Sequence, residues 1–412
     1  MNRLTLKPLT AFKILNFTLI AAFGVFMNFI NLHLEQIVGL TGSQIGAVTM
    51  VSMILVIVLN PVLGYIGDVT GQHVNMLRTA FLLTLIMALI YSQSMTFLMV
   101  IIVAVLFEGT RAIIPAFFDF LTTDYCEKEG YDYGKVRVYA SYGFLLMTML
   151  VGFMIAGVEL NFGVISFGFE GFMTIQTALF GTFFLLMLIS LIVSISLPKK
   201  NRHEKLDAPS FSAADVLALL ANKRYVFIVS FVVLSLITFE TSKMFFGNHL
   251  VIGLGASENI VSWITLIMVA PELLLIPHAS RLIKKVGFKR WYLFAMITMI
   301  FRTLVYSVTT SVNVFVVVSI VHSIGIAMHV SGNIMYIRKV VPQKNLGLAF
   351  TVLASSVALS RAFLSFLYGF LYERYDGFAV FRAVAVILTI GLVMVIKSKS
   401  LNEVGNQITA EH

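Results

Sequence analysis

Charged residues and cysteines are scarce in this chain, and each scarcity excludes a class of protein. Only 12% of the 412 residues are charged and 59% are hydrophobic, whereas an ordinary soluble domain is about one quarter charged. A soluble fold of this length has no way to hide so much apolar surface, but a lipid bilayer does. The single cysteine, Cys126, excludes an internal disulfide, and no zinc-site spacing of cysteine and histidine occurs.

The chain also lacks the motifs of an ATPase and of a catalytic site. Residues 130–136 superficially resemble a phosphate-binding loop, but three residues instead of four separate its glycines, and Val136 stands where Ser or Thr must bind Mg²⁺. No nucleophile and base gather near one surface. We therefore expect no enzyme, no cofactor and no metal, and we expect an ion gradient as the energy source. Basic cytoplasmic loops explain the net charge of +9 better than nucleic acid binding does.

Long apolar runs dominate the sequence. A membrane-spanning helix needs roughly 20 mostly apolar residues. The first run is too long for the core of a signal peptide and lacks a small-residue cleavage site. The pattern predicts an all-α membrane protein with twelve transmembrane helices. The runs cover residues 12–34, 44–66, 75–92, 96–118, 138–158, 173–197, 225–249, 260–280, 291–309, 313–336, 346–370 and 378–397.

Lys and Arg residues are distributed unequally between the two sides of this predicted bundle. If the loops alternate from a cytoplasmic N-terminus, 23 of the 29 Lys and Arg residues lie on the cytoplasmic side or at its helix ends. The outer side receives only Arg374 and Arg382. Because cytoplasmic loops collect basic residues, we predict a multi-pass protein of the bacterial inner (plasma) membrane with both termini in the cytoplasm.

A polar stretch midway along the chain divides it into two parts. Residues 198–224 form the longest such stretch and are rich in Lys and Arg. We predict a cytoplasmic linker here, between an N-terminal six-helix bundle (1–197) and a C-terminal six-helix bundle with a short cytoplasmic tail (225–412). Within the linker, the sequence from Ser212 to Asp215 predicts the capped start of a short surface helix.

The two halves resemble each other in sequence. When the second half is aligned so that His249 falls on His33, Gly255 falls on Gly39. The same constant offset also pairs Leu34 with Leu250, Pro61 with Pro277, Gly71 with Gly287 and Gly109 with Gly325. Parallel six-helix repeats are a known transporter architecture, in which the solute binds near the midplane of the membrane. The repeat therefore favours a transporter of a small solute.

Charged side chains inside the apolar runs are the first candidate functional residues. A charge at the centre of an inserting helix costs about 2.5–3.5 kcal/mol, so these groups should face the bundle interior and pair. Glu240 and Lys243 are three residues apart, as are Glu108 and Arg111, so each pair shares one helix face. Asp119 returns to the face of Glu108 after three turns. Either pair could instead be a structural ion pair.

Further polar side chains form stripes on other helices. Glu272 is isolated in an apolar run after Pro271, and the imidazole of His322 titrates near neutral pH, which suits proton coupling. We predict a polar cavity lined by the fourth, seventh, eighth, tenth and eleventh helices. Structural alternatives stay open: His322 as a hydrogen-bonded core residue, and Glu240 paired across helices with Arg361. The stripes consist of His322, His329 and Asn333, and of Arg361, Ser365 and Tyr368.

The loop after the second predicted helix resembles a family motif. Gly64-Tyr-Ile-Gly-Asp68-Val-Thr-Gly71 resembles the Gly-x-x-x-Asp-x-x-Gly loop of the major facilitator superfamily, although Gln72 and His73 replace its two usual basic residues. The resemblance implies a fold of two pseudo-symmetric six-helix bundles that usually works as a monomer. It also implies a conformational gate formed by Gly64, Asp68 and Gly71; helix capping by Asp68 is the alternative.

Three further segments resemble the oligosaccharide–proton symporter branch, which includes lactose permease and the phenylpropionate permeases. Pro115-Ala-Phe-Phe-Asp119 is similar to the end of its fourth helix, and Tyr-Gly-Lys-Val-Arg137 leading to Gly-Phe144 is similar to the start of its fifth. Pro271-Glu272-Leu-Leu is similar to its Gly-Glu-Leu-Leu. The resemblance implies that Asp119, Arg137 and Glu272 hold a sugar and that Phe144 stacks on its ring, where lactose permease has tryptophan.

The second half extends this resemblance to a charge network. Thr238-Phe-Glu240 resembles Thr-Tyr-Asp of the seventh helix. Arg302, His322 and Arg361 fall where lactose permease has its arginine, histidine and lysine. Three positions depart from the pattern: Gly325 replaces the proton-carrying Glu, Lys243 replaces the second acidic residue of the seventh helix, and Ser319 replaces the lysine of the tenth. The implied network for proton coupling comprises Glu240, Lys243, Glu272, Arg302, His322 and Arg361.

Two functions follow from these patterns. The first is proton-coupled symport, the uptake of a sugar, an oligosaccharide or another small polar organic solute by alternating access, with Glu272, His322 or Glu240 carrying the proton. The alternative is proton-antiport efflux of drugs or amphipathic compounds, which Arg111 and a Phe- and Met-rich cavity would suit. Residues 151–157 contain the glycines but not the proline of the antiporter motif, so uptake is favoured.

Overall fold

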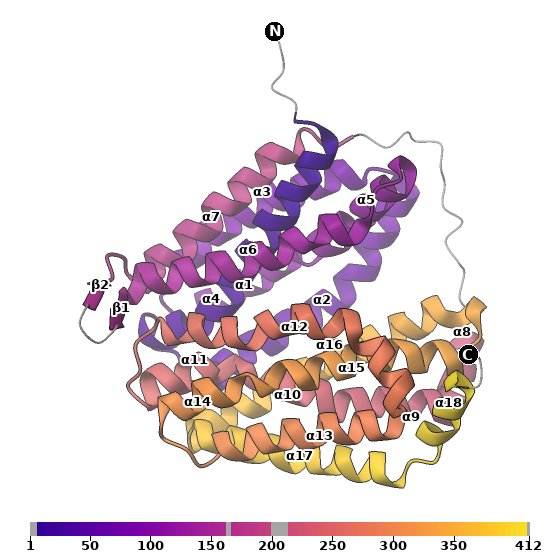
Figure 1. Cartoon of the computed structure of the whole chain (residues 1–412). Coiled ribbons are helices and arrows are strands. Elements are labelled where there is room, and N and C mark those ends of the chain that lie inside the picture. The colour runs from indigo at the N-terminus through magenta and orange to yellow at the C-terminus, as the bar shows by residue number, and fades with distance from the viewer. Residues whose placement is uncertain (1–5, 162–165, 199–212, 410–412) are drawn as a thin grey trace. The chain divides into compact units, whose positions relative to one another are not determined.

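The computed structural model of the chain describes residues 6–161, 166–198 and 213–409. Helices make up nearly all of it (Figure 1). The chain separates into two compact units. Unit 1 consists of residues 1–208 and also takes in Ser257–Ser262; unit 2 consists of the rest, beginning at Pro209. Of the predicted linker, residues 199–212 lie outside the described part of the chain.

Unit 1 contains seven described helices and one strand pair. Its helices are α1 (Pro8–Gln36), α2 (Gly42–Thr70), α3 (His73–Ser92), α4 (Phe97–Arg111), α5 (Ile113–Glu129), α6 (Tyr133–Ala156) and α7 (Ile175–Ser194). The helices α4 and α5 form one long span that is interrupted at Ala112. Pro115 explains the break, because it has no N–H to bond the carbonyl of Arg111 four residues earlier. The strands β1 (Val158–Asn161) and β2 (Ser166–Phe169) pair in antiparallel fashion.

Local sequence features of unit 1 determine where α2 begins and how closely α1 and α6 approach each other. The hydroxyl of Thr41 accepts a hydrogen bond from the backbone N–H of Gln44, and the backbone N–H of Thr41 donates one to the side chain of Gln44, which forms a capping box at the start of α2. The core helix α1 packs closely against α6 and α7. Gly143 permits that approach, since a Cβ at this position would overlap the carbonyl oxygen of Phe17. The close contact of α1 with α6 therefore depends on a missing side chain.

Unit 2 contains a seventh membrane span that is far less regular. It runs from Lys223 to Gly253 as α9 (Lys223–Val232), the π-helical η1 (Val233–Ile237), α10 (Thr238–Thr241), the 3₁₀-helical η2 (Ser242–Phe245), α11 (Phe246–Asn248) and the π-helical η3 (His249–Gly253). Short π-helical segments often mark functional sites. The remaining elements are α8 (Ala213–Ala221), α12 (Ile260–Val286), α13 (Phe288–Tyr306), α14 (Val312–Ser319), α15 (Val321–Val340), η4 (Gln343–Asn345), α16 (Leu346–Arg374), α17 (Gly377–Lys397) and α18 (Ser400–Thr409).

The predicted all-α membrane fold is confirmed. Each of the twelve apolar runs coincides with helix, and within the described residues ten helical spans are long and apolar enough to cross a membrane. The other two runs correspond to α12, whose apolar part is Ile260–Ile276, and to α13, which carries Lys289, Arg290 and Arg302. The strand pair β1–β2 was not predicted. The surface helix expected in the linker corresponds to α8, while its proposed cap, Ser212, lies outside the described residues.

The sequence repeat is also present in the backbone of each unit. Gly39 and Gly255 both adopt left-handed conformations, with φ of 75° and 69°. The N–H of Leu40 donates to the carbonyl of Leu34 at 2.9 Å, and the N–H of Ala256 donates to the carbonyl of Leu250 at 3.0 Å. These two bonds occupy equivalent positions in the alignment of the halves. The first span of each unit therefore ends in the same turn.

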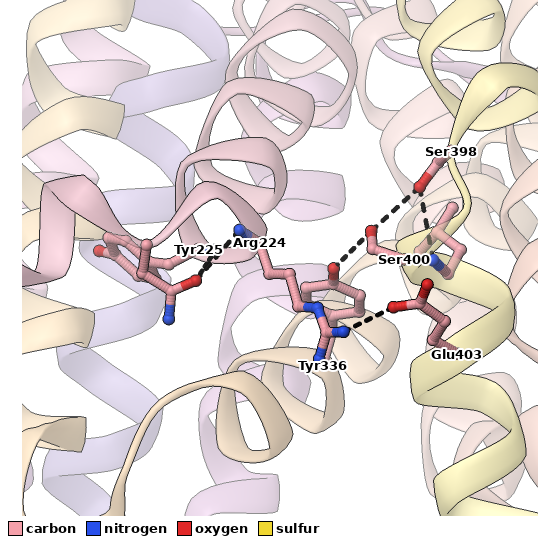
Figure 2. Close-up of polar contacts among 8 residues, drawn as sticks. Arg224, Tyr225, Tyr336, Ser398, Ser400 and Glu403 are labelled. Atoms are coloured by element: carbon pink, nitrogen blue, oxygen red, sulfur yellow. Dashed lines mark hydrogen bonds and ion pairs between the residues drawn. The ribbon is translucent and has the colours of Figure 1, made fainter.

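The last helix, α18, is fastened to unit 2 by polar contacts (Figure 2). The guanidinium of Arg224, at the start of α9, lies 2.6 Å from the carboxylate of Glu403. The hydroxyl of Tyr336 on α15 donates to the hydroxyl of Ser400 at 2.8 Å. Leu401 and Val404 are fully buried. Residues 400–404 therefore pack against the rest of unit 2.

Candidate functional site

A charged cluster lies inside unit 2, where the seventh span is irregular. The ammonium of Lys243 is 2.6 Å from one carboxylate oxygen of Glu240. The Nε2 atom of His322, on α15, is 3.4 Å from the other oxygen of Glu240 and 3.7 Å from the carboxylate of Glu272 on α12. One imidazole therefore lies between two carboxylates from different helices. These are groups that can exchange a proton within a span of apolar residues.

The members of this cluster differ in their access to solvent. The side chain of His322 is only 1% exposed, whereas those of Glu240 and Glu272 are 20% and 17% exposed and that of Lys243 is 35% exposed. The imidazole also stacks on the ring of Phe239, with the ring centroids 5.1 Å apart. The histidine is therefore fixed in the interior, and a proton or a solute would reach it through the carboxylates.

Arg302 is stabilised by aromatic rings. Its guanidinium carbon lies 4.5 Å from the ring centroid of Phe239, 4.6 Å from that of Tyr306 and 5.8 Å from that of Phe246. The residue is only 2% exposed, and its Nε and Nη2 atoms have no hydrogen-bond partner among the described residues. A cation over an aromatic face is attracted by the ring quadrupole. The three rings thus compensate a charge that sequence reasoning assigned to an ion network.

Arg361 lies on α16, the helix that packs along η1, α10 and η2. Two turns further along α16, the hydroxyl of Tyr368 donates to the carbonyl of Thr238 at 3.3 Å. The Nε atom of Arg361 is buried and has no hydrogen-bond partner in the described part of the chain. The alternative pairing of Glu240 with Arg361 is wrong, because Glu240 pairs with Lys243 and faces His322 instead.

The predicted stripe on the tenth span divides into two parts. His329 is fully buried; its Nε2 atom lies 2.9 Å from the hydroxyl of Ser235, and its Nδ1 atom lies 3.1 Å from the carbonyl of Gly325. Asn333 accepts a hydrogen bond from Tyr292 at 2.7 Å. These partners make His329 and Asn333 packing residues of unit 2. Of the stripe, only His322 faces the carboxylates.

The second predicted ion pair belongs to unit 1. The Nε atom of Arg111 donates to both carboxylate oxygens of Glu108, at 3.1 and 3.0 Å, and its Nη2 atom also donates to the carboxylate. The guanidinium lies 4.9 Å from the ring centroid of Phe23 on α1. This pair occupies the last turn of α4, directly before the break at Ala112. Its charges are mutually compensated.

Tyr133, which the sequence motifs do not single out, connects the predicted sugar-binding residues Asp119 and Arg137. The hydroxyl of Tyr133 donates to the carboxylate of Asp119 at 3.4 Å and is also hydrogen-bonded to Arg137. Its position four residues before Arg137, on the same face of α6, is the signal that would have identified it. Phe144 lies against α1 at Gly24, where a Cβ would overlap its ring. Tyr133 thus orders the carboxylate and the guanidinium relative to each other.

The gate motif lies at the end of α2. Gly71 closes this helix with φ of 64°, and its N–H donates to the carbonyl of Gly67 at 2.8 Å. The equivalent Gly287 has φ of 87° and donates to the carbonyl of Ile283 at 2.8 Å. Gly64 lies within α2. The side chain of Asp68 is outside the described part of the chain, so its role in gating stays a prediction.

Comparison with known proteins identifies the family. The family model described as "MFS_1 like family" matches residues 9–383. A maltose permease of Geobacillus stearothermophilus is 23% identical over 404 residues, which cover 97% of this chain and 96% of that protein. An uncharacterised transporter of Bacillus subtilis, YwbF, is 21% identical over 374 residues, covering 89% of this chain and 88% of that protein.

Solved structures show the same fold. The nucleoside transporter NupG superposes with a TM-score of 0.79 at 17% identity, covering 96% of this chain and 100% of that chain. A D-xylose–proton symporter superposes with a TM-score of 0.69 at 14% identity, covering 95% and 98%. Together with the family match over most of the sequence, these findings identify the chain as a multi-pass membrane transporter that belongs to the MFS_1 like family of the major facilitator superfamily.

Proposed function

We propose that the chain takes up a sugar or an oligosaccharide by proton-coupled symport with alternating access. The observation that carries this proposal is the position of His322 between Glu240 and Glu272 inside membrane-spanning helices. Intramembrane ionisable groups of this kind serve proton relays in transporters. The similarity to a maltose permease and to a D-xylose–proton symporter supports a sugar as the solute.

In this proposal the cluster of unit 2 holds the transported proton. The two carboxylates compete for one imidazole, so a proton can pass among three groups without leaving the cluster. Glu272 would take up the proton on the outer side, because it is partly exposed and has no lysine at ion-pair distance among the described residues. Lys243 would keep Glu240 in place through the 2.6 Å contact. Proton release toward the cytoplasm would then let an inward proton gradient drive net uptake.

The polar residues of unit 1 would recognise the solute. Asp119 accepts from hydroxyl groups and Arg137 donates to them, while Tyr133 keeps both oriented. The Phe144 ring would stack on the apolar face of a sugar ring. The pair Glu108–Arg111 compensates its own charges and would serve the packing of α4 on α1. Only the small solute, protons and lipid are then needed as partners, and one chain would suffice.

The orientation in the membrane is part of the proposal. The 23 basic residues assigned to one side support cytoplasmic termini in a bacterial inner membrane. The link between Arg224 and Glu403 joins the start of the seventh span to the C-terminal tail, which requires both to lie on the same side. An inward-directed proton gradient would therefore drive uptake.

The test uses purified protein in liposomes with an imposed pH gradient and a pH-sensitive dye inside. We expect proton influx on addition of maltose or a monosaccharide, and its loss in Arg137→Ala. Glu272→Gln should abolish accumulation driven by the gradient but retain exchange of sugar across the membrane. Proton flux with lipophilic cations, and none with any sugar or nucleoside, would overturn uptake in favour of efflux.

A further inference from the structure

The membrane interior of unit 2 contains more cations than anions. Among the described residues near the middle of its spans, Glu240 and Glu272 are acidic, while Lys243, Arg302 and Arg361 are basic. In unit 1 the corresponding groups balance, because Glu108 faces Arg111 and Asp119 is connected to Arg137. Charge at this depth is costly unless it is compensated. The surplus of unit 2 therefore needs an explanation.

Four of the five charges have a partner in the structure. Lys243 is paired with Glu240 at 2.6 Å. Glu272 faces the imidazole of His322 at 3.7 Å. Arg302 is almost completely buried beside the rings of Phe239, Phe246 and Tyr306, which closes its guanidinium to a ligand from solution.

Arg361 is the cation that remains. No carboxylate of the described residues lies within ion-pair distance of its guanidinium, and its Nε atom is buried without a hydrogen-bond partner. An unpaired buried donor on a charged group costs more than an unpaired neutral one. The residue as a whole is partly exposed. A ligand that supplies a negative charge would remove both penalties.

The sequence repeat relates Arg361 to a residue beside Phe144. In the alignment that places His249 on His33, Arg361 falls on Leu145 of α6, directly after Phe144. In unit 1 that level of the helix lies against α1 at Gly24, and in unit 2 the helix of Arg361 packs on the span that carries Glu240. Arg361 thus occupies in unit 2 the helix level at which unit 1 presents its aromatic residue.

We propose that Arg361 binds a carboxylate of the solute, so that the transported sugar is a monoanionic sugar acid such as a uronate. This inference rests on the proposed function and specifies its substrate class. The planar guanidinium can bind both oxygens of one carboxylate.

The experiment compares matched neutral and acidic sugars in liposomes that carry the full chain under an inward pH gradient. The pairs are glucose with glucuronate and maltose with maltobionate. We expect an apparent KM about tenfold lower for the acid of at least one pair. Arg361→Gln should raise the KM for that acid by about tenfold or more, since a hydrogen bond to a charged group is lost. The KM for its neutral partner should rise by a smaller factor, so that the preference for the acid is lost.

Two variants control for structural damage. Arg361→Lys keeps the charge but loses bidentate binding, so it should be intermediate. Arg374→Gln, at the exposed end of the same helix, should retain the preference of the wild type. Size-exclusion chromatography verifies that each variant is folded. If Arg361→Gln does not fold, the comparison of acidic and neutral sugars in the wild type alone decides.

The outcomes separate this inference from the proposed function. Uptake of neutral sugars in preference to both acids would overturn the inference and leave proton-coupled sugar uptake standing. A preference for glucose 6-phosphate over glucuronate would overturn the choice of a carboxylate. Equal loss of acidic and neutral uptake in Arg361→Gln, with the protein intact, would reduce Arg361 to a structural role. Absence of flux with every sugar would overturn both proposals.

Discussion

The first span of each unit occupies the same place in the repeat, yet the two spans differ in construction. In unit 1, α1 is an uninterrupted helix of 29 residues. In unit 2, Lys223–Gly253 passes through two π-helical segments and one 3₁₀ segment. The ends agree closely: His33 and His249 are both buried, and Gly39 and Gly255 make the same turn. The difference lies in the middle of the span.

The repeat identifies the positions responsible. In the alignment that places His249 on His33, Glu240 falls on Gly24 and Lys243 falls on Met27. At Gly24 the helix accepts the ring of Phe144, and at Met27 it is 62% exposed. At Glu240 and Lys243 it presents an ion pair. Equivalent positions of the repeat therefore serve packing in unit 1 and carry an ion pair in unit 2.

The largest effect is expected from removing the carboxylate of Glu240 from the seventh span. Glu240→Ala leaves Lys243 without its partner, so we expect loss of proton-coupled transport by more than about 100-fold. Removing one partner of a buried pair costs about 3–5 kcal/mol. Because this pair is partly exposed, we expect roughly 1–3 kcal/mol of destabilisation. Thermal unfolding in detergent and dye-based proton flux measure the two effects.

A double variant sharpens this result. Glu240→Ala with Lys243→Ala should recover most of the thermal stability without recovering transport. If the double variant is no more stable than Glu240→Ala, the cost does not come from an unpaired lysine.

The next largest effect is expected from a substitution in α1, where Gly24 packs against Phe144. Gly24→Val should displace the Phe144 ring, because even a Cβ would overlap it. We expect the KM for sugar uptake to rise by about tenfold, the equivalent of about 1.4 kcal/mol. Gly181→Val on α7 is the matched control, because nothing lies within 4 Å of a Cβ there. Adding Phe144→Leu to Gly24→Val should relieve the clash and restore the unfolding temperature, while the KM stays raised because the stacking ring is gone. An unfolding temperature that stays low would place the clash elsewhere.

A smaller effect concerns the aromatic surroundings of Arg302. Arg302→Lys keeps the charge but replaces a planar group that spreads over three rings by a compact one. A desolvated cation–π contact contributes about 2 kcal/mol, so we expect a loss of about 1 kcal/mol in thermal unfolding. A variant as stable as the wild type would show that the rings accept any cation.

The smallest difference, none at all, is expected between two variants that test the symmetry itself. Gly39→Ala and Gly255→Ala both force an L-residue into a left-handed conformation, at a cost of about 1–2 kcal/mol each. No atom lies within 4 Å of a Cβ at either site, so backbone strain is the sole cost. The two variants should therefore lower the unfolding temperature equally. A clear inequality would mean that the two turns differ in their importance to the units.

The sequence predicts the twelve spans well, because the hydropathy of a stretch long enough to cross the bilayer can be read without any knowledge of tertiary contacts. It predicts Glu240–Lys243 and Glu108–Arg111 for a similar reason, since both pairs are local on one helix. It does not predict the rings around Arg302 or the facing of His322 and Glu272, which depend on how separate helices pack. The π-helical and 3₁₀ segments also escape prediction, because their residues keep an ordinary apolar helical pattern.

The tie between Arg224 and Glu403 has a consequence for biogenesis. The two residues are 179 positions apart, and the tie closes only after the last helix has left the ribosome. Until then, Arg224 at the start of the seventh span lacks its acidic partner, and the positions that Leu401 and Val404 fill stay empty. Nascent chains truncated after residue 397 should therefore be cleared by membrane quality control faster than the full-length protein.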